Sequence, residues 1–407
     1  MKLELIATAT FGLEAVVRRE IEALGFKIIK VEDGRVTYIA NEAGVARSNL
    51  WLRCADRVLL KIGEFPVLTF EDLFQGMKAI PWETLIPEDG NFIVGATSVK
   101  SKLSSVPACQ SVAEKALIER LSETYRLPET HSLSGTHGLS ETHGLSGTHG
   151  LSKTHGEKRF SKTGAVFDVK LRILKDVCTV TVDTSGAGLH KRGYRSANVE
   201  APIKETLAAA LVSLSFWKPG RFLADPFCGS GTIAIEAALI GRNIAPGLNR
   251  SFAAEAWDFV PQEIWKRERA EAYKKIDLST DIRIEASDIS KKAITAAKEN
   301  AENAGVGDCI QFTVKSFTSF KSIINGGIIV CNPPYGERIG EKKQIEDVYR
   351  ELRSFFDENP SWSLFLITSD KNFEKDVMGK VADRRRKLYN GRIETTYYQY
   401  HGRKRDD

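Results

Sequence analysis

The chain of 407 residues and 45.2 kDa carries 58 basic and 53 acidic side chains, a formal surplus of +5. This length predicts two or three domains, and 42% hydrophobic with 27% charged residues is typical of a globular protein. A surplus this small excludes a uniformly basic coat for nucleic acid. No apolar run could span a membrane, no signal-peptide pattern opens the chain, and the six cysteines form no Cys-x-x-Cys pair. Together these features predict a soluble, reduced, cytoplasmic protein without a metal centre.

The first part of the chain predicts short strands and amphipathic helices in an α+β order. A hairpin turn is expected at Asp33-Gly34 and another at Lys175-Asp176, and Gly25 is expected to end the first helix. The expected strands are Leu3–Ala9, Lys27–Val31, Arg35–Ala40, Asn91–Val99, Val166–Leu174 and Val177–Val182, and the expected helices are 13–24, Glu71–Met77 and Ser111–Leu121.

A tandem repeat with a period of six interrupts this region between Thr130 and Gly156, and it contains five of the seven histidines. Regularly spaced imidazoles could chelate a metal weakly. However, the period matches neither a helix nor a strand, and the tract is rich in Gly, Ser and Thr, which cannot form a core. We therefore expect an expanded surface insert at about 130–157, and titration of the excised peptide with nickel or zinc would test the metal alternative.

From Pro202 onward, helices alternate with short apolar strands, which predicts a doubly wound α/β sheet. A connector at Gly186–Arg195, rich in glycine, precedes this region. The expected strands are Phe222–Phe227, Arg283–Ala286, Cys309–Val314, Gly327–Cys331 and Leu364–Thr368, and the expected helices are Ile203–Leu214, Thr232–Ile240 and Lys291–Ala304.

A glycine loop, Asp225-Pro-Phe-Cys-Gly-Ser-Gly-Thr232, follows the first of these strands and opens a helix. Gly229 and Gly231 allow a sharp turn and close approach of a ligand to the backbone, and Asp225 could hold a cationic amino group. A tight turn needed only for packing is the alternative, because Gly-x-Gly alone is a weak signal. The loop lacks the Gly-Lys-Ser/Thr of a P-loop, which disfavours ATP.

A second acidic residue, Asp288, ends the next strand and is suited to binding the two ribose hydroxyls of an adenosine cofactor. It lies 63 residues after Asp225, far more than the roughly 20 usual for this fingerprint. An insertion from Gly241 to about Asp277 is therefore expected to loop out between the two strands.

A third motif, Asn332-Pro333-Pro334-Tyr335-Gly336, follows the strand Gly327–Cys331. If Asn332 and the Pro333 carbonyl accept the two hydrogens of an exocyclic base amine, its nitrogen can pyramidalise and point its lone pair at an electrophile. The prolines restrict the backbone around these acceptors, and Tyr335 offers a face for stacking a base taken out of its helix. An ordinary turn is the alternative for this motif alone.

Taken with these motifs, residues 190–400 resemble the class I S-adenosylmethionine-dependent RNA methyltransferases that carry an N-terminal THUMP domain. The chain is most similar to bacterial 23S rRNA guanine-N2-methyltransferases of the RlmL type. Thr8–Gly25 resembles the family's opening segment, and further matches are Leu189–Arg195, Pro202–Ala209, Asp225–Thr232, Gly241–Trp257, Asn332–Arg338 and Lys387–Tyr400.

The resemblance implies a Rossmann-like, mostly parallel methyltransferase sheet, preceded by an α+β ferredoxin-like and THUMP region that binds RNA. It implies a ferredoxin-like subdomain at 1–65, a THUMP domain at 66–185 and a methyltransferase domain at 186–407. Asp225, Gly229 and Gly231 would cradle the methionine part of S-adenosylmethionine, which becomes S-adenosylhomocysteine, and Asp288 would bind its ribose. The remaining expected cofactor residues are Phe227, Cys228, Ser230, Thr232 and Ile289, and the expected base-binding residues are Asn332, Pro333, Pro334 and Tyr335.

RNA contact is expected from the THUMP region and from two basic segments. These segments contain Lys191, Arg192 and Arg195 in the connector and Arg384, Arg385, Arg386 and Lys387 near the C-terminus. Residues 380–407 alone hold nine basic and four acidic side chains, a surplus equal to that of the whole chain. A solvated charged face is an equally good interpretation of the run at 384–387.

One position departs from the family pattern. Ser316 and Ser319 stand where an Asp near the cofactor adenine is usual, so the adenine contact is open. The expected reaction is methyl transfer to the N2 amine of a guanine, with 23S rRNA favoured. A tRNA guanine-N2-methyltransferase, a DNA adenine-N6 methyltransferase and a non-catalytic RNA-binding protein remain as alternatives, and the sequence does not define the oligomeric state.

Overall fold

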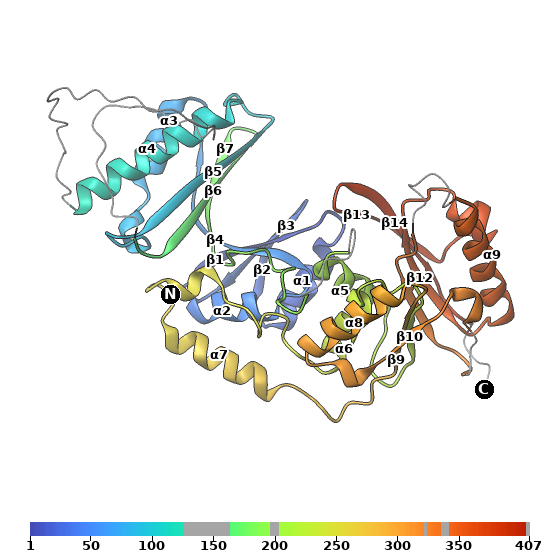
Figure 1. Cartoon of the computed structure of the whole chain (residues 1–407). Helices are drawn as coiled ribbons and strands as arrows, with labels where there is room; N and C mark the ends of the chain where they lie inside the picture. Colours follow the sequence, from blue (N-terminus) through green and yellow to red (C-terminus); the bar gives the residue numbers. More distant parts are fainter. Residues whose placement is uncertain (126–162, 196–202, 321–323, 335–341, 404–407) are drawn as a thin grey trace, which may run out of the picture. The chain divides into compact units, whose positions relative to one another are not determined.

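The computed structural model describes residues 1–125, 163–195, 203–320, 324–334 and 342–403 (Figure 1). The chain divides into two compact units. The first contains Met1–Leu60, Asp183–Glu255 and Val260–Asp407, and the second contains Lys61–Val182 and Ala256–Phe259. The ferredoxin-like subdomain was expected at 1–65, and residues 1–60 of it lie in the same compact unit as the C-terminal half. The expected histidine repeat lies outside the described residues.

The N-terminal part of the first unit is a small antiparallel sheet with two helices. The first helix buries Val16, Val17 and Ile21, and the second buries Val45 and Leu50. Strands β1 (Leu3–Ala9), β2 (Lys27–Glu32), β3 (Arg35–Ala40) and the first half of β4 (Ala55–Pro66) pair in the order β2-β3-β1-β4, with helices α1 (Glu14–Ala23) and α2 (Glu42–Trp51).

The second unit is an α+β layer in which α3 and α4 cover one face of a sheet (Figure 1). Trp257, which comes from the predicted insertion, belongs to this unit, and its ring stacks on Phe167 at 4.9 Å between centroids. The elements are α3 (Phe70–Ala79), β5 (Asn91–Val99), α4 (Val106–Tyr125), β6 (Val166–Leu174) and β7 (Val177–Asp183), and the sheet order is β4-β7-β6-β5.

The C-terminal part of the first unit is a seven-stranded sheet in the order β10-β9-β8-β11-β12-β14-β13. The first five strands are parallel to one another, and β14 is antiparallel to both of its neighbours, β12 and β13, which confirms the expected doubly wound, mostly parallel sheet. Its strands are β8 (Leu223–Asp225), β9 (Ile284–Asp288), β10 (Ile310–Val314), β11 (Ile328–Cys331), β12 (Ser363–Thr368), β13 (Arg384–Asn390) and β14 (Ile393–Tyr400).

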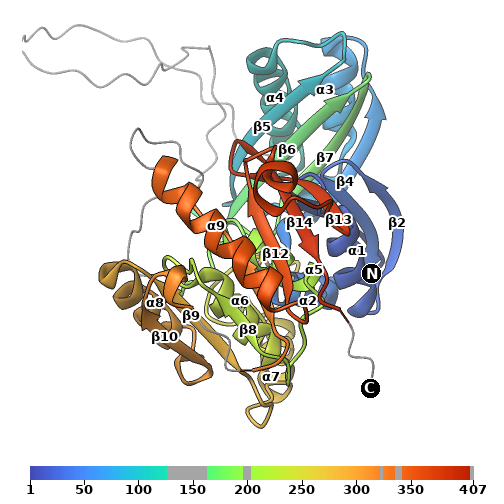
Figure 2. The same ribbon diagram turned by 90° about the vertical axis from the view of Figure 1, so that its right-hand side faces the viewer.

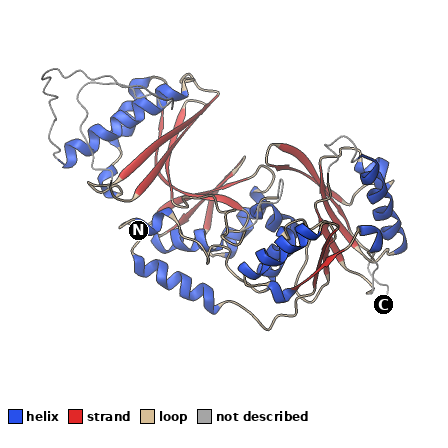
Figure 3. Cartoon of the chain, viewed as in Figure 1, coloured by secondary structure: helices blue, strands red, loops and turns tan. Residues whose placement is uncertain are grey.

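Helices cover both faces of this sheet, as the secondary-structure colouring in Figure 3 makes visible. In Figures 1 and 2, α9 lies on the face opposite to α6 and α8, where Leu352 and Phe355 pack on Ile329 and Leu364 in an aromatic-rich core. The helices around this sheet are α5 (Glu205–Leu214), α6 (Thr232–Gly241), α8 (Lys291–Asn303) and α9 (Lys342–Glu358), whereas α7 (Gln262–Lys274) packs on α2. None of the helices in the described residues is long and apolar enough to cross a membrane.

The segment between Gly241 and Asp277 is more ordered than the expected loop, because it contains α7 and packs on the N-terminal sheet domain. Glu268 of α7, 4% exposed, accepts two hydrogen bonds from Arg47 of α2, at 2.8 and 3.0 Å. Gly247 lies so close to α2 that an added Cβ would be 2.8 Å from the Leu50 Cα. This segment therefore joins the N-terminal sheet to the C-terminal sheet within the first unit.

Candidate active site

The three motifs converge because the strands that carry them are neighbours. In the order β9-β8-β11 all three strands are parallel, so their carboxyl ends lie at one edge of the sheet. Asp288 ends β9, Asp225 ends β8, and Asn332 directly follows β11. The chain continues from β8 to β9 on one side and later returns to add β11 on the other side of β8. Open α/β sheets bind ligands at such a topological switch point.

The glycine loop leaves β8 through Pro226, which cannot donate a ladder hydrogen bond, and β8 is therefore shorter than predicted. Gly229 has φ +52° and nothing lies within 4 Å of an added Cβ, so its backbone is open to a ligand. Gly231 has φ +81° and sits immediately before α6, where a Cβ would be 3.0 Å from the Cβ of Ala297. Gly229 is thus needed for access of a ligand to the backbone, and Gly231 for close packing of the start of α6 against α8.

The loop is held by groups from β9 and α8. Asp288 accepts the backbone N–H of Gly229 at 3.0 Å, and the Cys228 N–H donates to the Ser287 carbonyl at 3.0 Å. Asn300, fully buried in α8, donates its side-chain amide to the Ser230 carbonyl at 3.1 Å. Sequence reasoning missed Asn300, although a polar amide within an Ala-rich helix is a signal of a buried hydrogen-bond role.

Asp225 is the most unusual group of the site. It is 1% exposed. Its Oδ1 accepts the Phe227 N–H at 3.3 Å, while Oδ2 is buried and has no hydrogen-bond partner among the described residues. Burial raises the pKa of Asp225; the Phe227 N–H lowers it in part and the nearby Asp288 carboxylate adds to the rise, so that the pKa lies at about 8. A buried carboxyl oxygen without a partner fits the expected amino group of a ligand.

The other predicted cofactor residues frame this edge. The Phe227 ring is partly buried, with its centroid 5.6 Å from that of the Phe317 ring. Ile289, next to Asp288 in the chain, is 73% exposed. Ser230 and Cys228 are buried within the loop. Ser316 accepts the N–H of Thr318 at 3.4 Å and Ser319 is exposed.

After β11, Asn332 is half-buried, Pro333 is buried and Pro334 is exposed, while Tyr335 lies outside the described residues. The strand itself is fully buried, ending at Cys331. Strand β11 pairs with β8 in parallel, so the carboxyl ends of the two strands are neighbours. The Asn-Pro-Pro segment after β11 therefore lies beside the glycine loop after β8.

One prediction on RNA contact is wrong. Arg192 is 3% exposed and pairs with the fully buried Glu236 of α6 at 3.3 Å, so it is not available to phosphates. Arg195 is partly buried and pairs with Glu205 at 3.1 Å, whereas Lys191 is exposed. Glu236 in the otherwise apolar sequence TIAIEAALIG was the signal for this pair, because a buried carboxylate requires a partner.

The basic run forms β13, the edge strand of the sheet. Arg384, Arg385 and Lys387 are exposed, but Arg385 pairs with Glu374 at 3.0 Å and Lys387 with Glu394 at 2.6 Å. Arg386 donates to the Gly12 carbonyl at 2.9 Å and so contributes to packing against the N-terminal sheet domain. Among the described residues, no group of three acidic, His or Cys side chains could hold a metal.

Comparison with known proteins agrees with this architecture. Residues 192–399 match the family described as RMKL-like methyltransferase domain, residues 4–59 the RlmL ferredoxin-like domain, and residues 68–130 the THUMP domain.

Individual relatives match over almost the whole chain. A protein of Bacillus subtilis named putative RNA methyltransferase YpsC is 45% identical over 98% of this chain and 96% of its own length. The ribosomal RNA large subunit methyltransferase K/L of Psychromonas ingrahamii is 32% identical over 96% of this chain, which spans 49% of that protein. The crystal structure of SMU.472, described as a putative methyltransferase complexed with SAH, superposes with a TM-score of 0.87 at 38% identity, covering 100% of this chain and 99% of that one. The chain belongs to the RMKL-like methyltransferase family.

Proposed function

We propose that this chain is an RNA methyltransferase that transfers the methyl group of S-adenosylmethionine to the N2 amine of a guanine in 23S rRNA. The observation that carries the proposal is the convergence of Asp225, Asp288 and Asn332 at the carboxyl ends of three adjacent parallel strands. The THUMP match and the relatives named as RNA and rRNA methyltransferases support RNA as the substrate class.

S-adenosylmethionine is the cofactor, and the residues present fit it. The unpartnered Oδ2 of Asp225 suits its amino group, and the open backbone at Gly229 leaves room for its methionine part. Asp288 already accepts the Gly229 N–H on Oδ2 and the Ser290 N–H on Oδ1, and its second lone pairs suit ribose hydroxyls. When bound, the cofactor supplies an electrophilic methyl group on a sulfonium.

The chain's own residues act mainly by positioning the base. Asn332 Oδ1 and the Pro333 carbonyl accept the two hydrogens of the guanine amine, which turns the nitrogen lone pair toward the glycine loop. Pro333 and Pro334 restrict the backbone around these acceptors. Directly after the transfer the nitrogen carries a positive charge, and this ammonium-like group is acidic enough to lose its proton to water, so no side chain is needed as a base.

The test is methylation of RNA extracted from a strain lacking the gene, followed by nucleoside mass spectrometry and mapping. We expect the wild-type protein to form N2-methylguanine in the 23S rRNA. Asn332→Ala should abolish transfer while leaving affinity for S-adenosylhomocysteine nearly unchanged. Equal loss of both would contradict the role of Asn332, and methylation of tRNA or of adenine in duplex DNA would replace the proposed substrate.

A further inference from the structure

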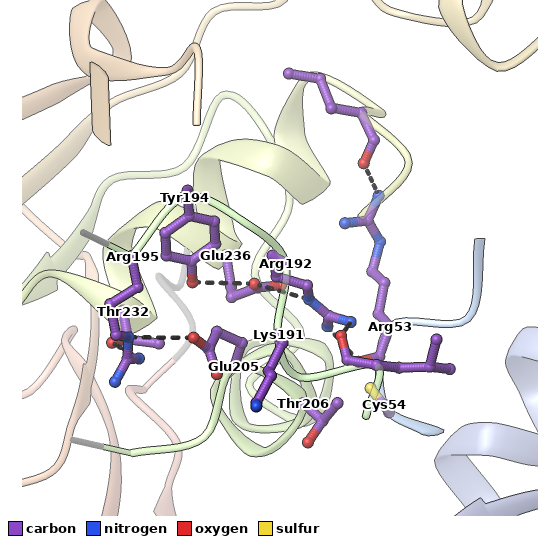
Figure 4. Close-up of polar contacts among 12 residues, drawn as sticks. Arg53, Cys54, Lys191, Arg192, Tyr194, Arg195, Glu205, Thr206, Thr232 and Glu236 are labelled. Carbon is purple, nitrogen blue, oxygen red and sulfur yellow. Dashed lines mark hydrogen bonds and ion pairs between the residues drawn. The ribbon is translucent and has the colours of Figure 1, made fainter. Parts of the chain in front are cut away.

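The connector Leu189–Arg195 directs three side chains at the helices behind the glycine loop (Figure 4). Arg192 and the Tyr194 hydroxyl both donate to Glu236 of α6, at 3.3 and 3.2 Å. Arg192 also donates to the Arg53 carbonyl in the N-terminal sheet domain. The connector is therefore hydrogen-bonded to α6 on one side and to the N-terminal sheet domain on the other.

Arg195 lies at the end of this connector and contacts the loop itself. One Nη donates to the Thr232 hydroxyl at 3.0 Å and to the Ile203 carbonyl at 3.2 Å, while Nε pairs with Glu205 at 3.1 Å. The Arg195 side chain is 20% exposed and that of Glu205 7%, so the pair is little screened by water. In Figure 4 the Arg195 and Glu205 side chains point toward each other beside Thr232.

Thr232 is the residue through which Arg195 can affect the cofactor site. It is 2% exposed, begins α6, and follows Gly231 directly. Its hydroxyl also lies 3.4 Å from the Ser230 hydroxyl, while the N-cap residue Gly231 provides no side-chain cap. The end of the loop is consequently anchored from outside, by Arg195 at Thr232 and by Asn300 at Ser230.

We propose that Arg195 is a positioning residue for the methyl donor, acting through the Thr232 hydroxyl to hold the glycine loop in its binding conformation. This inference rests on the proposed function, because it assigns the donor to that loop. Since coupling between two sites is reciprocal, donor binding then stabilises the Arg195–Thr232 contact as much as the contact favours binding. A purely structural pair would stabilise the fold without changing donor affinity.

The experiment measures S-adenosylhomocysteine affinity by calorimetry, and Tm separately, for the full chain. Arg195→Gln and Thr232→Val should each weaken binding about tenfold, the loss of one hydrogen bond to a charged group. The double variant should be no weaker than the poorer single one, since both changes remove the same contact. Arg195→Lys should recover part of the affinity, and Thr232→Ser should retain it.

Arg250→Gln is the matched control. Arg250 donates to the carbonyls of Gly188 and Lys191, at the start of and within the same connector, at 2.6 and 3.0 Å, rather than to a residue of α6. This variant should lower Tm while its S-adenosylhomocysteine affinity stays at the wild-type value.

Unchanged affinity in Arg195→Gln and Thr232→Val, or fully additive losses in the double variant, would overturn the inference. If Arg195→Gln does not fold, equal affinities of Thr232→Val and Thr232→Ser would overturn it as well. Failure of the wild-type chain to bind S-adenosylhomocysteine would instead contradict the proposed function, so the two failures are distinguishable.

Discussion

Replacing Asp225 by Asn should make the ligand-free protein more stable at neutral and alkaline pH. The carboxyl is 1% exposed and burial raises its pKa to about 8, whereas an Asp in an unfolded chain titrates near 3.8. Between these values the folded protein keeps a proton that the unfolded chain has lost. The free energy of unfolding therefore falls as pH rises, by up to about 1.4 kcal/mol per unit.

The magnitude follows from the width of this window. A pKa difference of roughly four units between the folded and unfolded states corresponds to about 5 kcal/mol of folding stability. This stability is fully present below about pH 4 and is lost by the time the pH passes about 8. Asn is neutral at every pH and has nearly the same shape, so it avoids this loss. Because 1 kcal/mol moves Tm by about 2–4 °C in a domain of this size class, the Tm advantage of Asp225→Asn should grow by about 10 °C from pH 4.5 to pH 8.5.

The assay is differential scanning calorimetry of both proteins across this pH range. Asp376→Asn, which changes an exposed carboxylate of the same unit, is the control and should show no such trend. The same Asp225→Asn variant should bind S-adenosylhomocysteine about 10–100-fold more weakly, because it removes a charge-assisted hydrogen bond to the amino group. A Tm difference that is constant with pH would refute the assignment of a buried, protonated Asp225.

Three further changes test the packing around the site and in the second unit. Arg192→Met should destabilise the protein by about 3–5 kcal/mol in denaturant unfolding, because it removes the cation that pairs with the buried Glu236, and adding Glu236→Gln should recover much of this loss. Gly231→Ala should lower both Tm and S-adenosylhomocysteine affinity, since φ is +81° and the new Cβ would be 3.0 Å from Ala297. Gly76→Ala in α3 should cost about 1–3 kcal/mol despite better helix propensity, because its Cβ would overlap the Phe65 ring.

Each of these has a result that would contradict it. Wild-type stability of Arg192→Met would show that Glu236 does not need its cation. Gly25→Ala is the control for backbone strain alone, since its φ is +84° with nothing within 4 Å, and a larger Tm loss there than at Gly231 would remove the packing argument. If Gly76→Ala stabilised the protein, α3 would have to move away from the Phe65 ring of β4 without a cost in folding stability.

Local sequence signals predicted many of the elements well. Leu3–Ala9, Arg35–Ala40, Asn91–Val99 and Val166–Leu174 have the predicted bounds, because alternation and turn residues determine short strands that have one buried face. The turn at Lys175-Asp176 has both residues at positive φ, as a two-residue hairpin requires. In contrast, α2 and α7 were missed, and they stabilise each other through Arg47 and Glu268.

The sequence by itself determined the chemistry of the candidate site: a glycine loop, two acidic strand ends and an Asn-Pro-Pro segment, each beside a predicted buried strand. Their convergence depended on the strand order β9-β8-β11, which arises from long-range pairing that no local pattern encodes. Only the tertiary structure showed that Arg192 is buried against Glu236 and that Arg195 holds Thr232. A sequence shows where charges lie along the chain, whereas their exposure depends on what packs over them, and this distinguishes a surface arginine from a buried one.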